Sequence, residues 1–296
     1  SQATTPSHGR AQGRARPLLS RKTRQTLGVG AIHLTLIVGA VALMMPLAWM
    51  LSTSLKPRGA IFLFPPQWIP RPIVWQNYVE AHSAQPFNLF YRNTVLITAV
   101  SMLGTMLSSS LVAFSFSRLR WWGRDMMFLL VLATMMLPFH VTIIPQFVIF
   151  RVIGWLDTFL PLTVPTFCGG SFFIFLLRQF FLTIPLEMDD AARIDGCSTL
   201  GIYWRIMLPQ CKPALMAVGI FTFQNAWGEF FRPLIYLQSK EKWTVALALR
   251  SFSGEFSTDW NLLMAASLVA IVPALVIFFF GQKYFIQGVV FTGVEK

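Results

Sequence analysis

The order of hydrophobic and polar positions along the chain predicts six membrane-spanning helices separated by short polar segments. Each apolar run is long enough, at about 1.5 Å per residue, to cross much or all of a hydrocarbon core about 30 Å thick. We expect an all-α polytopic membrane protein, with a third span broken at Pro138 and Pro145 and a thin, flexible middle in the fourth at Gly169. The expected spans cover residues 27–50, 93–116, 126–150, 160–177, 214–237 and 262–280.

The composition agrees with a membrane location and argues against a soluble or nucleic-acid-binding protein. The 296 residues have a mean hydropathy of +0.59, and only 12% of them are charged, which is unlike a soluble domain. The net charge of +12 is high, but the basic residues lie between apolar runs and not in an aromatic-rich patch. The three cysteines have no metal-ligand spacing, so we expect neither a metal site nor a disulfide framework.

The distribution of basic residues predicts that both termini are cytoplasmic. Of the 24 Lys and Arg residues, 15 fall in the segments expected inside and eight in those expected outside, as the positive-inside rule requires. Residues 1–26 are basic and poor in hydrophobic residues, so we expect a disordered cytoplasmic tail, although an Arg-rich transit peptide is an alternative. The first span has no small-residue cleavage site and should be retained. The membrane domain should cover 27–285, followed by a cytoplasmic tail at 286–296.

The most polar internal stretch lies between the expected fourth and fifth spans, at residues 185–209. It contains four acidic residues within nine positions. Pro185 suits the start of a helix, Gly196 can end one in a left-handed conformation, and Ser198 can cap the next. The second helix should stop before Pro209. The sequence therefore predicts two short helices joined by a glycine turn on the cytoplasmic side.

The residues of this stretch resemble the EAA loop of ABC importer permeases. The first position departs from the family pattern, because an aspartate stands where glutamate is usual and the side chain is one methylene shorter. The alternative interpretation is an amphipathic helix pair on the membrane surface. The resemblance is carried by Asp190-Ala191-Ala192, Gly196, Ile206 and Leu208-Pro209 at the family's spacing.

Shorter segments in the same order extend the resemblance to the maltose-type, carbohydrate-importing group, from about Lys56 to Lys296. Each segment is weak alone, and their order and spacing carry the similarity. They include Asn77-Tyr78, Asn93-Thr94, Gly123-Arg124, Gly154-Trp155-Leu156-Asp157, Trp227 to Phe230, and Gln282 to Gly288. The family often has Asn where this chain has Gly228.

The resemblance implies a permease subunit in a bacterial or archaeal cytoplasmic membrane. Its implied partners are a second permease subunit, two ATPase subunits that bind ATP and Mg, an extracytoplasmic solute-binding protein, and membrane lipid. The loop at 187–209 would be the coupling helix, which passes ATPase movement to the spans. The implied coupling residues are Glu187, Asp190, Ala191, Ala192, Gly196, Ile206, Leu208 and Pro209; a solvated surface position is as good an interpretation of Glu187.

The chain contains no G-x-x-x-x-G-K-[ST] phosphate loop and no hydrolase or metalloprotease motif. We therefore expect no enzyme activity and no cofactor in this chain. A self-sufficient secondary transporter is the competing class, but it should show inverted repeats or charges in several spans. Within the family, the sequence leaves open a sugar, a polyol or a glycerol phosphate as the solute.

The expected fifth span carries the polar residues most suited to a solute pathway, because polar groups within a membrane usually face a cavity or a partner. Asn225, Glu229 and Arg232 are spaced for one face of a helix. Amide and carboxylate groups beside aromatic rings suit a hydroxyl-rich solute. An internal Glu229–Arg232 ion pair that only holds spans together is an equal alternative, and the main contacts could lie in the partner permease. The candidates are Gln224, Asn225, Trp227 and Glu229.

Overall fold

The computed structural model describes residues 21–254 and 258–290, with side chains described at 28–254 and 258–283. The described residues are nearly all helical, and their strand pairing is limited to one isolated bridge between Ser253 and Thr258. The chain divides at Met50 into two units, which are described separately. The expected all-α class is confirmed for this part of the chain.

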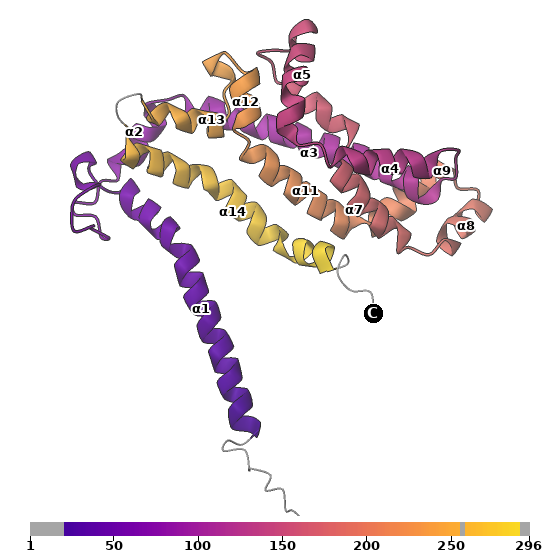
Figure 1. Cartoon of the computed structure of the whole chain (residues 1–296), viewed down its shortest axis with the longest axis horizontal. Coiled ribbons are helices and arrows are strands. Elements are labelled where there is room, and N and C mark those ends of the chain that lie inside the picture. The colour runs from indigo at the N-terminus through magenta and orange to yellow at the C-terminus, as the bar shows by residue number, and fades with distance from the viewer. Residues whose placement is uncertain (1–20, 255–257, 291–296) are drawn as a thin grey trace, which may run out of the picture. The chain divides into compact units, whose positions relative to one another are not determined.

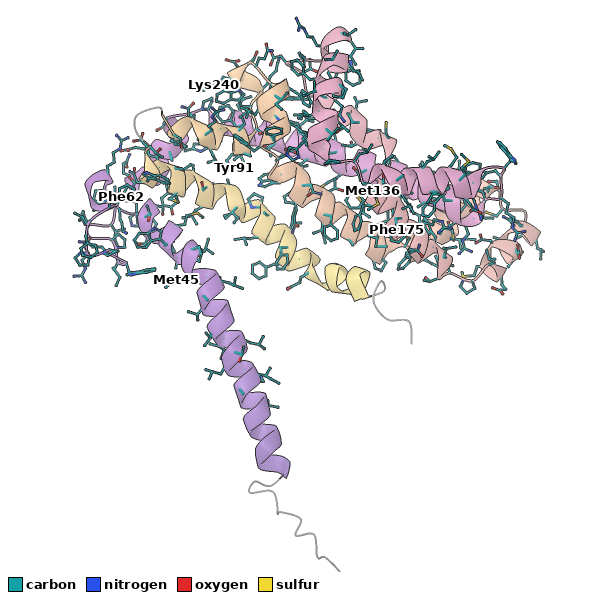
Figure 2. All side chains as sticks on the ribbon, in the orientation of Figure 1. Met45, Phe62, Tyr91, Met136, Phe175 and Lys240 are labelled. Carbon is teal, nitrogen blue, oxygen red and sulfur yellow. The ribbon has the colours of Figure 1, made fainter. Side chains whose placement is uncertain are left out.

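The first unit consists of most of α1 (Arg21–Ser54), a 34-residue helix that contains Pro46. Its apolar stretch from Gly28 to Ser54 has none of its most hydrophobic window buried within the protein. Figure 2 shows Met45 projecting from this helix, and Met45 is exposed. A predominantly apolar helix of this length suits a lipid environment. The helix begins six residues earlier than expected, at Arg21, whereas residues 1–20 of the expected tail lie outside the described residues.

The second unit is organised around α3 (Phe87–Arg118), which packs against α7 (Ser171–Leu182) and α11 (Lys212–Trp227). The final helix, α14 (Trp260–Val290), lies beside α11 and contacts α2 (Gln76–Ser83), as Figure 1 shows. Small and hydroxyl residues are buried along the middle of α3, among them Ser101, Gly104 and Ser109. Such residues allow membrane helices to approach closely.

Four helical stretches are long and apolar enough to cross a membrane, and the number rises to six if two sharply bent helix pairs each count as one span. The expected third span is one of these pairs. It comprises α4 (Arg124–Thr134) and α5 (Phe139–Val152), which meet at 99°. Pro138 lies at the break. The helix is interrupted there because proline has no N–H to donate and disfavours helical geometry in the residue before it. Pro145 lies inside α5 without ending it.

The expected fourth span is formed by α6 (Leu160–Thr163), a 3-10 turn η2 (Val164–Cys168), and α7, and the helical path is interrupted between η2 and α7. Gly169 has φ of 79° between them, a conformation that favours glycine. The flexible middle inferred from the two adjacent glycines is therefore a break in the helix. The sixth span is longer than expected, since α14 continues to Val290; residues 291–296 of the expected tail lie outside the described residues.

The expectation of one continuous fifth helix over 214–237 is wrong. The helix α11 ends at Trp227, and α12 begins at Phe231 and ends at Tyr236. The carboxylate of Glu229 accepts hydrogen bonds from the backbone N–H groups of Phe231 and Arg232, at 3.1 and 3.3 Å. These bonds satisfy N–H groups at the start of α12 that have no partner within the helix. Glu229 therefore caps a new helix in place of continuing the old one.

Candidate functional site

The polar stretch forms the expected pair of short helices. The helix α8 (Glu187–Ile194) is followed by the cap residue Asp195 and then by Gly196, which has φ of 79° and turns the chain. The Gly196 N–H bonds to the Arg193 carbonyl and the Cys197 N–H to the Ala192 carbonyl, the paired bonds of a glycine-terminated helix end. The Ser198 Oγ then accepts a hydrogen bond from the Gly201 N–H at 3.2 Å, capping α9 (Thr199–Ile202).

The helix after this cap does not stop before Pro209, so that part of the prediction is wrong. After α9 the chain makes a π-helical turn, η3 (Tyr203–Met207), and then continues as α10 (Leu208–Gln210). The Leu208 N–H bonds to the Tyr203 carbonyl, five residues back. Pro209, which has no N–H to donate, then falls in the first turn of α10, where none is needed. The π-helical turn thus lets the helical path pass a proline.

The eight residues assigned to coupling divide between two faces of this helix pair, which we call the hairpin (187–210). The exposed face carries Glu187, Asp190, Ala191, Gly196 and Pro209. Ala192 is buried, and Ile206 and Leu208 are partly buried against the hydrophobic core. The exposed residues are free to meet another surface, whereas these three hold the hairpin against α3, α7 and α11.

One contact that the sequence interpretation missed fixes the hairpin to the second unit. Asp189 and Arg118 are almost fully buried, with side chains 3% and 2% exposed and a shortest N–O distance of 3.7 Å. The Arg118 guanidinium also donates to the carbonyls of Phe181 and Ile184 at 2.7 and 2.6 Å. Arg118 thus joins the ends of α3 and α7 to the first turn of α8. The three-residue spacing of Asp189 and Ala192, which places both on one helix face, was the available signal.

Tyr203 provides a second attachment between the hairpin and α3. Its side chain is fully buried, and its hydroxyl lies 2.7 Å from the Ser110 hydroxyl. Its ring packs against Phe114 with centroids 5.3 Å apart. The hairpin is therefore held at one point by a charge pair and at another by an aromatic anchor, and both points lie on α3.

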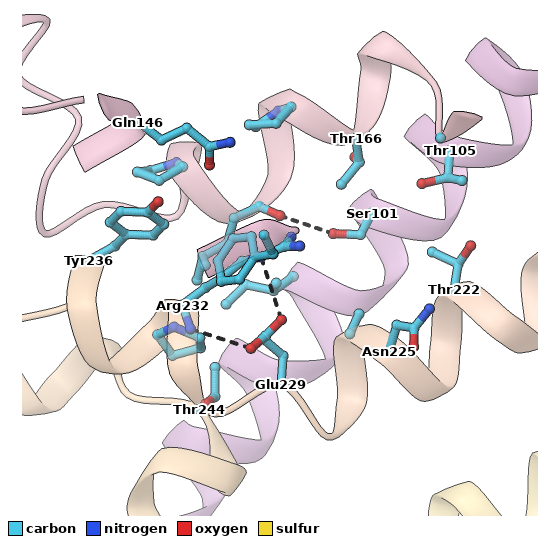
Figure 3. Close-up of a pocket in the computed structure, with 18 of the residues that line it drawn as sticks. Ser101, Thr105, Gln146, Thr166, Thr222, Asn225, Glu229, Arg232, Tyr236 and Thr244 are labelled. Atoms are coloured by element: carbon cyan, nitrogen blue, oxygen red, sulfur yellow. Dashed lines mark hydrogen bonds and ion pairs between the residues drawn. The ribbon is translucent and has the colours of Figure 1, made fainter. Parts of the chain in front are cut away.

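A cavity of about 590 Å³ lies between α3, α5, α6, η2, α11 and α12. Its walls are rich in hydroxyl and amide groups, as Figure 3 shows. This size falls in the range of small-molecule sites. The polar lining residues are Ser101, Thr105, Gln146, Thr166, Thr222, Asn225, Glu229, Arg232, Tyr236 and Thr244.

Glu229 and Arg232 lie together in the cavity wall (Figure 3). The Glu229 carboxylate is 3.5 Å from the Arg232 Nε, and the guanidinium lies over the Phe139 ring, 4.8 Å from its centroid. The ion pair is thus internal to the segment 229–232, while the cation–π contact joins α12 to α5. The pair leaves this wall with little net charge but with polar atoms directed into the cavity.

The four candidate pathway residues separate in the structure. Asn225 and Glu229 line the cavity, although the break after Trp227 means that they do not share one continuous helix face with Arg232. Gln224 is exposed and lies outside the lining. Trp227 is buried, donates its Nε1–H to the Ala270 carbonyl at 2.9 Å, and stacks on Phe223. Trp227 therefore packs α11 against α14.

A family model for the binding-protein-dependent transport system inner membrane component matches residues 103–290. The chain is 32% identical to an arabinooligosaccharide transport permease of Halalkalibacterium halodurans, covering 82% of this chain and 86% of the relative. It is 31% identical to a sulfoquinovosyl glycerol transport permease of Agrobacterium fabrum, over 84% and 88%. It is 30% identical to an sn-glycerol-3-phosphate transport permease of Yersinia pestis, over 87% and 94%.

The fold is similar to a chain in the crystal structure of a bacterial ABC transporter involved in the import of the acidic polysaccharide alginate. The TM-score is 0.79 at 24% identity, covering 91% of this chain and all of the other. A chain in the crystal structure of a bacterial alginate ABC transporter in complex with an alginate pentasaccharide-bound periplasmic protein gives a TM-score of 0.67 at 16% identity, covering 88% of this chain and 94% of the other.

Proposed function

This chain belongs to the family of binding-protein-dependent transport system inner membrane components, as a permease subunit of an ABC importer, and from that premise we propose that it imports a carbohydrate through the cavity beside α11. The cavity carries this proposal, because its hydroxyl and amide lining provides many hydrogen-bond donors and acceptors. The relative named for arabinooligosaccharides is consistent with it.

The second candidate solute is a glycerol phosphate or another small anion. A relative named for sn-glycerol-3-phosphate supports it. The state of Arg232 argues against it, because Glu229 already neutralises this guanidinium at 3.5 Å. An anionic solute would have to displace the carboxylate before it could use the charge. A neutral, hydroxyl-rich solute can hydrogen-bond to both partners with the pair intact.

For the mechanism, we infer alternating access driven by two separate ATPase subunits that bind ATP and Mg. The exposed face of the hairpin, with Asp190 and Gly196, would seat on one ATPase from the cytoplasmic side. A second permease subunit would complete the pathway, and an extracytoplasmic binding protein would deliver solute. In this arrangement both termini of the chain are cytoplasmic.

The helix α3 supplies the mechanical link in this proposal. Ser110 contacts the hairpin through Tyr203, and Ser101, nine residues earlier on the same helix, lines the cavity. The two positions are separated by about 14 Å along the helix axis. A rigid helix attached at Arg118 and Ser110 would carry movement of the hairpin directly to the cavity wall.

The test uses the reconstituted complex with the variant Asn225→Ala, which removes an exposed amide from the cavity wall. We expect uptake to fall about tenfold, because one or two hydrogen bonds to solute are worth about 1–1.5 kcal/mol net. Assembly and basal ATP hydrolysis should be unchanged. The matched control is Gln224→Ala, the neighbouring amide outside the cavity, which should leave uptake near the wild-type rate. Equal uptake in both variants would remove the cavity from the solute path.

A further inference from the structure

A second cavity, of about 520 Å³, lies at the end of α3 beside the start of α4. Its lining is basic, with Arg118, Arg120 and Arg124, and the acidic lining residue is Asp125. It is separate from the solute cavity, with which it shares no lining residue. The contact with Asp189 accounts for the charge of Arg118, but neither that contact nor the solute cavity involves Arg120 or Arg124.

The existing partners of the three arginines determine which of them can bind a ligand in this cavity. Arg118 is committed to Asp189 and to two carbonyls. Arg124 donates to Asp125 at 2.8 Å and to the Leu119 carbonyl at 3.3 Å, which leaves several of its five N–H groups for another acceptor. Among the described residues, Arg120 has no ion pair or side-chain hydrogen bond, and it is exposed. The cavity can therefore present two guanidinium groups to an anion.

The surroundings of the cavity are strongly apolar. Trp122 is 97% exposed, and the adjacent Trp121 is also exposed. Beyond them α4 buries none of its residues and presents Met126, Met127, Leu129 and Leu130 to the outside. Tryptophan side chains in this position are typical of the boundary between headgroups and acyl chains.

We propose that this cavity binds the phosphate of an anionic phospholipid, whose acyl chains lie along the exposed face of α4. Arg120 and Arg124 would donate to the phosphate oxygens, since a guanidinium can form paired hydrogen bonds with such a group. Trp121 and Trp122 would lie at the headgroup level. A free phosphate could use the arginines but not the apolar face. An acidic protein surface could likewise use the charges and leave α4 uncovered.

The site adjoins the hairpin, because Leu186, which directly precedes α8, also lines the cavity. Arg118, another lining residue, is the charge partner of Asp189 in the hairpin. A bound lipid would therefore contact the segment that joins α7 to the hairpin.

The test measures lipid binding to the full-length chain in nanodiscs of phosphatidylcholine with increasing phosphatidylglycerol. Native mass spectrometry counts the phosphatidylglycerol molecules that remain bound. We expect Arg120→Gln to weaken the apparent affinity about fivefold, since one basic residue contributes about 1 kcal/mol to anionic-lipid binding. Arg120 is exposed and forms no ion pair or side-chain hydrogen bond with the described residues, so the variant should fold. Lys212→Gln, which removes an exposed charge outside this cavity, is the matched control and should bind as the wild type does.

Two further arms separate a lipid from other occupants. Inorganic phosphate or glycerol phosphate added at millimolar concentration should not displace the lipid, because neither covers α4. Trp122→Ala should weaken binding of phosphatidylglycerol without affecting any binding of inorganic phosphate. Equal affinity in Arg120→Gln and wild type would overturn the proposal. Ready displacement of the lipid by inorganic phosphate would also overturn it. A loss of ATPase docking in Arg120→Gln with lipid binding unchanged would do the same, because it would assign the arginine to a protein contact.

Discussion

At the residue scale, Gly196 is the position where backbone conformation most restricts the amino acid. Its φ of 79° is in the left-handed region, and a Cβ placed there would have no atom within 4 Å. A substitution is therefore limited by backbone strain and by whatever docks on the surface, not by crowding within this chain. The sequence predicted this turn correctly because the glycine follows a short, regular helix.

Replacing Gly196 with valine should uncouple transport, since the left-handed conformation costs a β-branched residue about 1–2 kcal/mol or more and the side chain enlarges the docking face. Gly196→Asn is the control, because asparagine tolerates this conformation better. We expect both variants to insert in the membrane and only the valine variant to lose ATP-driven uptake. Wild-type uptake in Gly196→Val would show that the turn does not contact the ATPase closely.

The buried pair of Asp189 and Arg118 gives a second residue-scale prediction. Asp189→Asn leaves a buried guanidinium without its charge partner, a change that costs about 3–5 kcal/mol. Asp190→Asn alters an adjacent carboxylate that is 68% exposed and, within the described part of the chain, pairs with Arg193 alone, so the loss should be below about 1 kcal/mol. Thermal unfolding of the two purified variants in detergent measures the difference. Equal melting temperatures would mean that this pair does not anchor the hairpin.

At the element scale, helical runs with uninterrupted apolar residues were predictable and the breaks within them were not. α3 and α14 follow directly from length and hydropathy. The break after Trp227 was missed because glycine and glutamate are both compatible with a helix interior. The break depends on hydrogen bonds from the backbone N–H groups of α12 to the Glu229 carboxylate. The spacing of hydrophobic residues in the sequence does not reveal these bonds. The π-helical turn before Pro209 was also missed, because it depends on a backbone hydrogen bond from Leu208 to Tyr203 that the spacing of residues does not reveal.

A further element-scale contact joins the loop after α5 to the segment after α12. Asp157 has φ of 56°, unusual for a residue other than glycine, and its N–H bonds to the Tyr236 carbonyl. Its carboxylate accepts hydrogen bonds from the N–H groups of Gln238 and Ser239 and from Lys242 Nζ at 2.9 Å. The contact therefore fixes the chain directly after Tyr236, which lines the cavity that we propose for the solute.

This contact should weaken as the pH falls. Burial raises the pKa of Asp157, but the hydrogen bonds from Ser239, Lys242 and Gln238 outweigh it and hold the pKa below its ordinary value. A depressed pKa in the folded state means that the stabilisation is fully present above the unfolded value of about 4 and is lost progressively as the pH falls from there towards the folded value. Thermal unfolding between pH 7 and pH 3 should show a larger decline for wild type than for Asp157→Asn. Parallel declines would assign the acid sensitivity to other carboxylates.

At the scale of the whole molecule, the sequence predicted the membrane class and the family better than it predicted the residues of the cavity that we propose for the solute. The EAA-type spacing lies within one local segment and is readable directly. The cavity gathers residues from segments more than 100 positions apart, such as Ser101 and Arg232, and only packing brings them together. Two of the four candidate residues, Asn225 and Glu229, line this cavity. Asn225 lies in α11 and Glu229 lies in the break between α11 and α12.

The most direct test of the account is ATP-driven uptake from a panel of sugars by proteoliposomes that contain the complete complex, with wild-type chain or the variant Asp190→Lys. We predict that the wild-type complex accumulates a sugar only with ATP and loaded binding protein. The variant should assemble but accumulate little, because the reversed charge lies on the exposed face of the hairpin. Accumulation without the ATPase subunits, or at the wild-type rate in Asp190→Lys, would contradict the account.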